Sequence, residues 1–257
     1  MLFLLSPAKT LDYETPPTTD TATRPQFVEQ SAQLIDLLRP KSAAQIALLM
    51  DLSPALAELN VERYAAWSPR FTARNSKQAV LAFDGDVYGG LDAPSLSEAD
   101  LAWAQKHVAI LSGLYGLLRP LDRMQPYRLE MGTALRNPRG KDLYAYWAGV
   151  ITPHLNRRLA GEKERIVVNL ASQEYFGAVR RRDLRARVID CVFEEGKPEG
   201  YKVISFFAKR ARGLMVRHAI QQRVQTPEGL RDFALDGYRL DESASEADRL
   251  VFRRRVE

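Results

Sequence analysis

Short apolar runs and amphipathic stretches alternate along the chain, and their periods predict a mixture of strands and helices. LFLL at 2–5 is a continuous apolar run that ends at Ser6 and Pro7, which is typical of a short buried strand. Further apolar or β-branched runs predict strands at 107–111 (HVAIL), 165–170 (RIVVNL), 187–193 (RVIDCVF) and 201–205 (YKVIS). GKPEG at 196–200 predicts a hairpin between the last two strands.

Helical periodicity and capping residues predict the remaining elements. The predicted helices span 26–38, 42–50, 53–67, 97–106, 142–159 and 206–224. The start at Ser53 is well marked, because serine caps helices and Pro54 suits the first turn. Pro153 predicts a kink or a break within the fifth helix. At 100° per residue, the last helix has a packing side and a basic side. The packing side holds Phe207, Ala211, Leu214 and His218, and the basic side holds Lys209, Arg212 and Arg223.

The order of these elements predicts the class of fold. Strands and helices follow one another without strict alternation, which favours an irregular mixed α/β or α+β fold, with a mixed sheet surrounded by helices. The chain has no long Gly/Ser-rich or Pro-rich linker and no repeat, and the Thr- and Pro-rich stretch 12–25 is expected to be a connecting loop. A length of 257 residues with 46% hydrophobic content supports one large core. We therefore expect residues 1–257 to form a single domain.

Charge and cysteine content narrow the possible environments. Lys and Arg outnumber Asp and Glu by 37 to 32, and the excess is concentrated at 180–187, 209–223 and 253–255. Such clusters favour a polyanion as partner, although each also fits an ordinary solvated surface. The opening MLFLL is too short for a secretory segment or a membrane span, so we expect a soluble, cytoplasmic protein without membrane contact. The single cysteine, Cys191, fits a reducing compartment and is expected to be either a core residue or a redox-sensing thiol.

Several familiar chemistries lack their sequence motifs. The three histidines, His107, His154 and His218, have no metal-ligand spacing, and there is no CxxC pair. GxSxG, GxxxxGK[ST] and GxGxxG are also missing from the sequence, which removes support for a serine hydrolase, a P-loop or a dinucleotide site. Asp84 and Asp86 flank Gly85 and suit either turn capping or, together with Glu130 or Asp122, a divalent-cation site.

The stretch 111–133, LSGLYGLLRPLDRMQPYRLEMGT, carries the densest chemistry. A predicted strand runs into Ser-Gly and then turns, which is a common place for backbone to meet a ligand. Gly113 and Gly116 can expose N–H groups to a phosphate, or can form a plain left-handed turn. Three arginines lie close together in this stretch, with two tyrosines interleaved, a pattern that suits a groove along a nucleic-acid backbone. They are Arg119, Arg123 and Arg128, with Tyr115 and Tyr127.

Five blocks of the chain resemble those of one family, the peroxide-stress proteins called YaaA. The blocks are LSPAKTLD at 5–12, FDGDVYGGL at 83–91, the stretch 111–133, NLASQEYF at 169–176 and FFAKRARGLMVR at 206–217. Because they cover nearly the whole chain, it is identified as a full-length member. The resemblance implies a cytoplasmic protein of the hydrogen-peroxide response that limits free iron and so protects DNA. It also implies non-sequence-specific binding of duplex or distorted DNA through a basic cleft that includes a helix-hairpin-helix-like element.

The residues expected to bind DNA follow from this cleft. In the turn, Gly113-Leu114-Tyr115-Gly116 is one residue longer than the usual hairpin. Lys209 and Arg212 are placed opposite it by the family's cleft, and are expected to form its second wall. The full predicted binding set is Lys9, Gly113, Tyr115, Gly116, Arg119, Arg123, Arg128, Lys209, Arg212 and Arg217. Glu130 is expected to pair with an arginine or to act as an acid–base group.

Two other functions stay open. The first is an enzyme that acts on a small anionic or nucleotide-like substrate in the same cleft, because the turns, carboxylates and hydroxyls of these blocks suit a small-molecule site. Its candidate residues are Lys9, Asp86, Arg128, Glu130 and Lys209. The second is direct iron sequestration by Asp84, Asp86 and Glu130. No cofactor is predicted.

Overall fold

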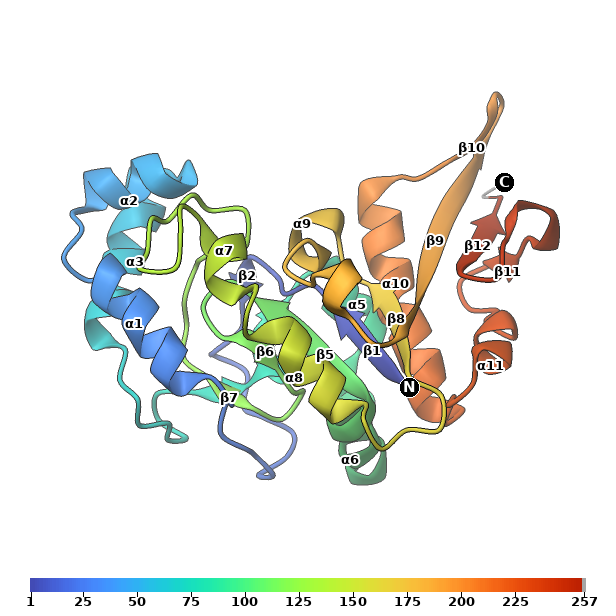
Figure 1. Ribbon diagram of the computed structural model, residues 1–257, viewed down its shortest axis with the longest axis horizontal. Helices are drawn as coiled ribbons and strands as arrows, with labels where there is room; N and C mark the ends of the chain where they lie inside the picture. Colours follow the sequence, from blue (N-terminus) through green and yellow to red (C-terminus); the bar gives the residue numbers. More distant parts are fainter. Residues whose placement is uncertain (256–257) are drawn as a thin grey trace.

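A central, mostly parallel sheet organises the molecule, as the computed structural model of residues 1–255 shows (Figure 1). Its strands lie in the order β11-β12-β9-β8-β1-β5-β6, and β10 pairs with β9. Neighbours from β12 to β5 run parallel, whereas β6, β10 and β11 are antiparallel to their partners. The strands are β1 (Leu2–Leu5), β5 (Val108–Ser112), β6 (Gly116–Leu118), β8 (Ile166–Leu170), β9 (Arg187–Lys197), β10 (Gly200–Lys202), β11 (Arg239–Leu240) and β12 (Arg249–Arg254).

Two short two-stranded sheets and the helices complete the fold. The small sheets pair β2 (Thr10–Leu11) with β4 (Phe83–Asp84), and β3 (Lys77–Gln78) with β7 (Arg123–Met124). The helices are α1 (Val28–Leu38), α2 (Ala43–Met50), α3 (Pro54–Ala66), α4 (Ala79–Ala82), α5 (Asp86–Leu91), α6 (Glu98–His107), α7 (Leu143–Trp147), α8 (Ile151–Arg158), α9 (Gln173–Phe176), α10 (Ser205–Gln221) and α11 (Pro227–Arg231). This architecture confirms the expected mixed α/β fold with a mixed sheet among helices.

The central strands are buried on both faces, which explains their continuous apolar runs. In β1, all four residues are buried, and β5 is buried along its whole length. Helices α6 and α10 lie on one side of the sheet, and α7 and α8 lie on the other (Figure 1). Predicted helix starts at Ser42, Ser53 and Ser97 are confirmed, because each serine side chain accepts a hydrogen bond from a first-turn amide.

Two predicted elements differ in detail. The helix expected over 142–159 is divided into α7 and α8 by residues 148–150, and Pro153 lies in the first turn of α8, where proline is tolerated. The strand expected over 201–205 is shorter, because β10 ends at Lys202 and α10 begins at Ser205.

Cys191 is buried in β9, where burial raises the pKa of its thiol to about 12. Among the described residues, no helix is long and apolar enough to cross a membrane.

Candidate functional site

The candidate site lies where the loops after β1 and β8 meet. These strands are parallel neighbours, and the chain leaves β1 toward β5 but leaves β8 toward β9, on the other side. Strands with diverging connections leave a crevice at their carboxyl ends, which is where open α/β sheets bind ligands. The two loops are joined directly, because the Ser172 amide donates to Ser6 Oγ at 2.9 Å.

A pocket of about 420 Å³ occupies this crevice, and we call it the switch-point pocket. Its walls come from four segments that are far apart in sequence: the loop after β1, the start of α5, the loop after β8 and the first half of α10. They contribute Ser6–Thr10, Asp84–Val87, Ser172, Glu174, Tyr175, Lys209 and Arg212. Five predicted residues are therefore brought together: Lys9, Asp84, Asp86, Lys209 and Arg212.

Helix packing fixes the distance between the acidic and basic walls of the pocket. Helices α5 and α10 cross in direct backbone contact, since Gly90 and Gly213 leave no space for side chains there. A Cβ on Gly213 would overlap the Val87 carbonyl oxygen, and one on Gly90 would overlap that of Arg210. Because Asp86 begins α5 and Arg212 precedes Gly213, this contact determines how the two charged groups face the pocket.

Arg212 is the unusual group of the pocket. The sequence placed it on the exposed basic side of its helix, but the side chain is largely buried, and its Nε has no hydrogen-bond partner among the described residues. Burial lowers the pKa of the guanidinium. Within residues 1–255, no carboxylate lies within salt-bridge distance of it. A buried cation without a protein counter-charge is costly, and such a group at a pocket wall fits an anionic ligand.

A chain of ion pairs borders the pocket on one side. Lys9 Nζ lies 3.0 Å from Glu130 Oε2, and Arg128 Nη2 lies 2.9 Å from Glu130 Oε1. Both ion pairs line a small cavity between Lys9 and Tyr175 that adjoins the larger pocket. The arginine pair expected for Glu130 is present. Glu174 is held in turn by the Gly132 amide at 2.9 Å, which connects the stretch 111–133 to the site.

The predicted Gly-rich DNA-binding turn has a different structure. Residues 113–115 join β5 to β6, which form an antiparallel pair, so the segment is a hairpin of strands and not of helices. Gly113 and Tyr115 are buried, and the Trp147 ring lies against Gly116 while its Nε1 donates to the Gly113 carbonyl at 2.8 Å. The expected helix-hairpin-helix-like element is thus wrong for this segment, because the surrounding apolar side chains bury the turn.

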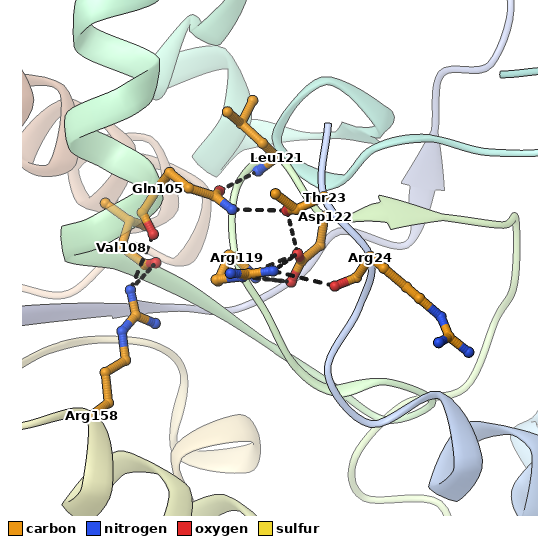
Figure 2. Close-up of polar contacts among 8 residues, drawn as sticks. All are labelled: Thr23, Arg24, Gln105, Val108, Arg119, Leu121, Asp122 and Arg158. Atoms are coloured by element: carbon orange, nitrogen blue, oxygen red, sulfur yellow. Dashed lines mark hydrogen bonds and ion pairs between the residues drawn. The ribbon is translucent and has the colours of Figure 1, made fainter. Parts of the chain in front are cut away.

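Three predicted DNA-binding arginines bind their own chain. Arg119 forms an ion pair at 2.8 Å with the fully buried Asp122, and it also donates to the Arg24 carbonyl (Figure 2). Arg123 donates to the Ser76 carbonyl at 3.2 Å. Arg217 donates to the Leu91 carbonyl at 3.0 Å and supports the loop after α5. These guanidinium groups lie outside the switch-point pocket and act as structural supports.

The acidic residues do not gather into a metal centre. No three His, Cys, Asp or Glu side chains in the part of the chain that the structure describes are placed to hold a metal ion. Asp84 and Asp86 line the pocket, but Glu130 contacts Lys9 and Arg128 instead. Asp122 accepts hydrogen bonds from Thr23 and Arg119, which occupies its carboxylate.

Sequence reasoning missed five polar side chains of the pocket: Ser6, Thr10, Ser172, Glu174 and Tyr175. Burial strongly raises the pKa of the Tyr175 hydroxyl, so this tyrosine stays protonated and can donate a hydrogen bond. One signal was available, because Ser6 and Ala171–Ser172 each follow a buried apolar strand directly. The missing information was that these two strands are neighbours.

The fold and the pocket define a class: an α/β protein with a ligand-type crevice at the carboxyl edge of a mostly parallel sheet. The chain belongs to the family described as peroxide stress protein YaaA, whose pattern matches residues 1–244. It is similar to a UPF0246 protein of Polaromonas sp. (strain JS666 / ATCC BAA-500), at 64% identity over 255 residues and 99% of each chain. A UPF0246 protein of Bordetella petrii is also 64% identical, over the full length of both chains. Membership in this family supports a role in the oxidative-stress response.

Proposed function

We propose that the protein serves the peroxide response by binding and acting on a small anionic molecule in the switch-point pocket. Arg212 carries this proposal, because a largely buried guanidinium at a pocket wall, with no carboxylate partner among residues 1–255, fits the counter-charge of a ligand. The exposed Lys209, one turn earlier on α10, supplies a second positive charge. The pocket volume of about 420 Å³ suits a metabolite-sized ligand.

The remaining groups suit proton transfer next to a bound anion. Asp86 faces the pocket from α5, and Glu130 is held by Lys9 and Arg128 at its border. A substrate that displaces the 3.0 Å contact between Lys9 and Glu130 can exchange a proton with either group. In this proposal Lys209 and Arg212 bind the anion, and Lys9, Glu130 and Asp86 are the candidate catalytic residues.

Non-sequence-specific DNA binding and limitation of free iron, which the family resemblance implies, form a second proposal. The exposed Lys9 and Lys209 at the pocket, together with the net charge of +5, support contact with a polyanion. The predicted binding set does not form one groove, because Gly113, Tyr115 and Gly116 are buried and three arginines are engaged elsewhere. DNA affinity that falls steeply with salt and is lost in Lys209→Ala/Arg212→Ala would favour this second function.

The experiment that tests the first proposal measures ligand binding to the purified protein. Pyrophosphate, AMP and citrate are titrated by calorimetry into the wild type, Arg212→Met and, as a control, Arg74→Met, which removes an exposed arginine outside the pocket. We expect at least one anion to bind, with about tenfold or greater loss in Arg212→Met and no change in the control. Equal affinities in all three proteins would show that Arg212 does not contact the ligand.

A further inference from the structure

A second cluster of cations lies at the opposite edge of the central sheet. Helix α8 ends at Arg158, whose Nη2 donates to the carbonyl of Lys106 at 2.8 Å and to that of Val108, the first residue of β5. The switch-point pocket is at the other end of these strands, after Leu5 and Leu170. Figure 2 shows Arg158 directed at the start of β5, with Arg119 turned toward Asp122.

These cations surround an open cavity of about 460 Å³, which we call the Arg158 pocket. Its titratable groups are all basic: Lys106, Arg119, His154, Arg157 and Arg158. The nearby Asp122 is already paired with Arg119 and is fully buried. Lys106, Arg157 and Arg158 have no carboxylate within salt-bridge distance in the described part of the chain, so the cavity has a positive excess.

Two buried polar atoms at this cavity lack partners among residues 1–255. They are Nη1 of Arg158 and Nε2 of His154. Burial, followed by the neighbouring cations, lowers the pKa of His154 to about 4, and burial with Arg119 lowers that of Arg158 to about 10. Both groups would therefore gain from a nearby negative charge, and a buried polar atom without a partner requires an explanation.

We propose that the Arg158 pocket binds the phosphate group of a small phosphorylated molecule, with Arg157, Arg158 and Lys106 as its counter-charges. Three cations without a carboxylate partner match a phosphate monoester dianion better than a singly charged carboxylate. Guanidinium groups also offer the forked donors that phosphate oxygens accept. The 460 Å³ volume leaves space for the organic part of the ligand.

Arg158 supports the end of α6, so the decisive variant leaves it in place. Lys106 and Arg157 are exposed, and neither side chain makes a hydrogen bond or ion pair within the described residues. Lys106→Gln/Arg157→Gln removes two of the three counter-charges without disturbing the fold. Arg74→Gln/Lys141→Gln makes the same change of charge on exposed residues outside the pocket and is the matched control.

The test follows the imidazole resonances of the three histidines by NMR during titration with inorganic phosphate, in chloride buffer of constant ionic strength. We expect phosphate to shift His154 and raise its pKa, while His107 and His218 stay unchanged. Affinity should fall about tenfold in Lys106→Gln/Arg157→Gln, and should be retained in the matched control and in Lys209→Gln, which alters only the switch-point pocket. An unmoved His154, or equal affinity in the double variant, would overturn the proposal.

Two organic probes identify the source of the phosphate. Glycerol 3-phosphate is a monoester dianion, whereas dimethyl phosphate is a singly charged diester like the links of a nucleic-acid backbone. A monoester that binds at least as tightly as inorganic phosphate, with a weaker diester, supports a small phosphorylated ligand. A diester that binds equally or more tightly would overturn that assignment in favour of a nucleic-acid backbone.

Discussion

The switch-point pocket and the Arg158 pocket lie at opposite edges of one sheet, and they differ in how their charges are balanced. The first combines cations with carboxylates, since Lys9 and Glu130 are 3.0 Å apart and Asp86 lines the same pocket as Arg212. The second has only basic side chains, and no carboxylate, around its cavity. A mixed set offers carboxylates that can accept protons from a bound ligand, whereas the unpaired cations of the second pocket suit the binding of an anion. Our two proposals accordingly place chemistry at the carboxyl edge of the sheet and anion binding at its amino edge.

The largest expected effect comes from separating α5 and α10, which form one pocket and not the other. Gly213→Ala places a Cβ against the Val87 carbonyl and forces the helices apart, so the free energy of unfolding should fall by about 3 kcal/mol. Anion binding at the switch-point pocket should be lost, while phosphate binding at the Arg158 pocket should remain. Denaturant unfolding and calorimetry measure the two effects. Gly149→Ala is the control, since no atom lies within 4 Å of its added Cβ, and a Gly213→Ala protein of wild-type stability would contradict the packing argument.

The Arg158 pocket should in turn make stability depend on pH. The pKa of His154 is about 4 in the folded protein, against an ordinary 6.5, because the ring is buried and faces Arg158, Arg157 and Arg119. Between these values the unfolded chain binds a proton that the folded protein does not, so stability falls as pH drops from 6.5 toward 4. With allowance for partial solvent exposure, the loss is about 2 kcal/mol. Denaturant unfolding over this pH range should show a smaller loss of stability in His154→Gln than in the wild type. Parallel stability curves for the two proteins would show that His154 is not the group responsible.

Removing a cation from the switch-point pocket should change the free energy of unfolding by a smaller amount, and should raise it instead of lowering it. Arg212→Met replaces a largely buried, unpaired guanidinium with an apolar side chain of similar length, so the free protein should gain about 1 kcal/mol. Arg217→Met, on the same helix, removes hydrogen bonds to the Leu91 and Asp92 carbonyls and should destabilise the protein. Thermal unfolding compares the two variants. If Arg212→Met is the less stable variant, Arg212 is a structural residue and not a ligand-binding one.

The sequence predicted the elements of the fold better than it predicted their neighbours. Apolar runs and serine caps located β1, β5, β8 and most helices, because these signals are local. Lys9, Asp86, Glu130 and Lys209 were selected by residue type alone, and the structure places them around one pocket and the cavity that adjoins it. Ser172 and Glu174 were missed because their role depends on β8 pairing with β1, across more than 160 residues of chain.

The errors have the same physical origin. The sequence around Gly113 and Gly116 suggests an exposed phosphate-binding turn, but Trp147, which lies in a helix distant in sequence, covers both glycines. The sequence suggests that Arg119 is a free basic side chain, but Asp122 and the Arg24 carbonyl bind it (Figure 2). Whether an arginine is free or engaged is decided by long-range contacts. A count of basic residues therefore predicts the charge of a surface better than it predicts the residues of a binding site.

The smallest change in stability is expected at Glu130, where one substitution separates ligand binding from proton transfer. Glu130→Gln breaks the pairs with Lys9 and Arg128, but Lys9 is 64% exposed, so the free energy of unfolding should change by less than about 1 kcal/mol. The loss of this carboxylate leaves Lys9 and Arg128 as the charged groups of the adjoining small cavity, so anions should bind several-fold more tightly by calorimetry. Lys9→Gln, which removes the opposite charge, should weaken binding. If Glu130 transfers a proton, turnover of a substrate should fall at least about 100-fold in Glu130→Gln while its binding improves, and this separation of binding from turnover would not arise in a pocket that only binds.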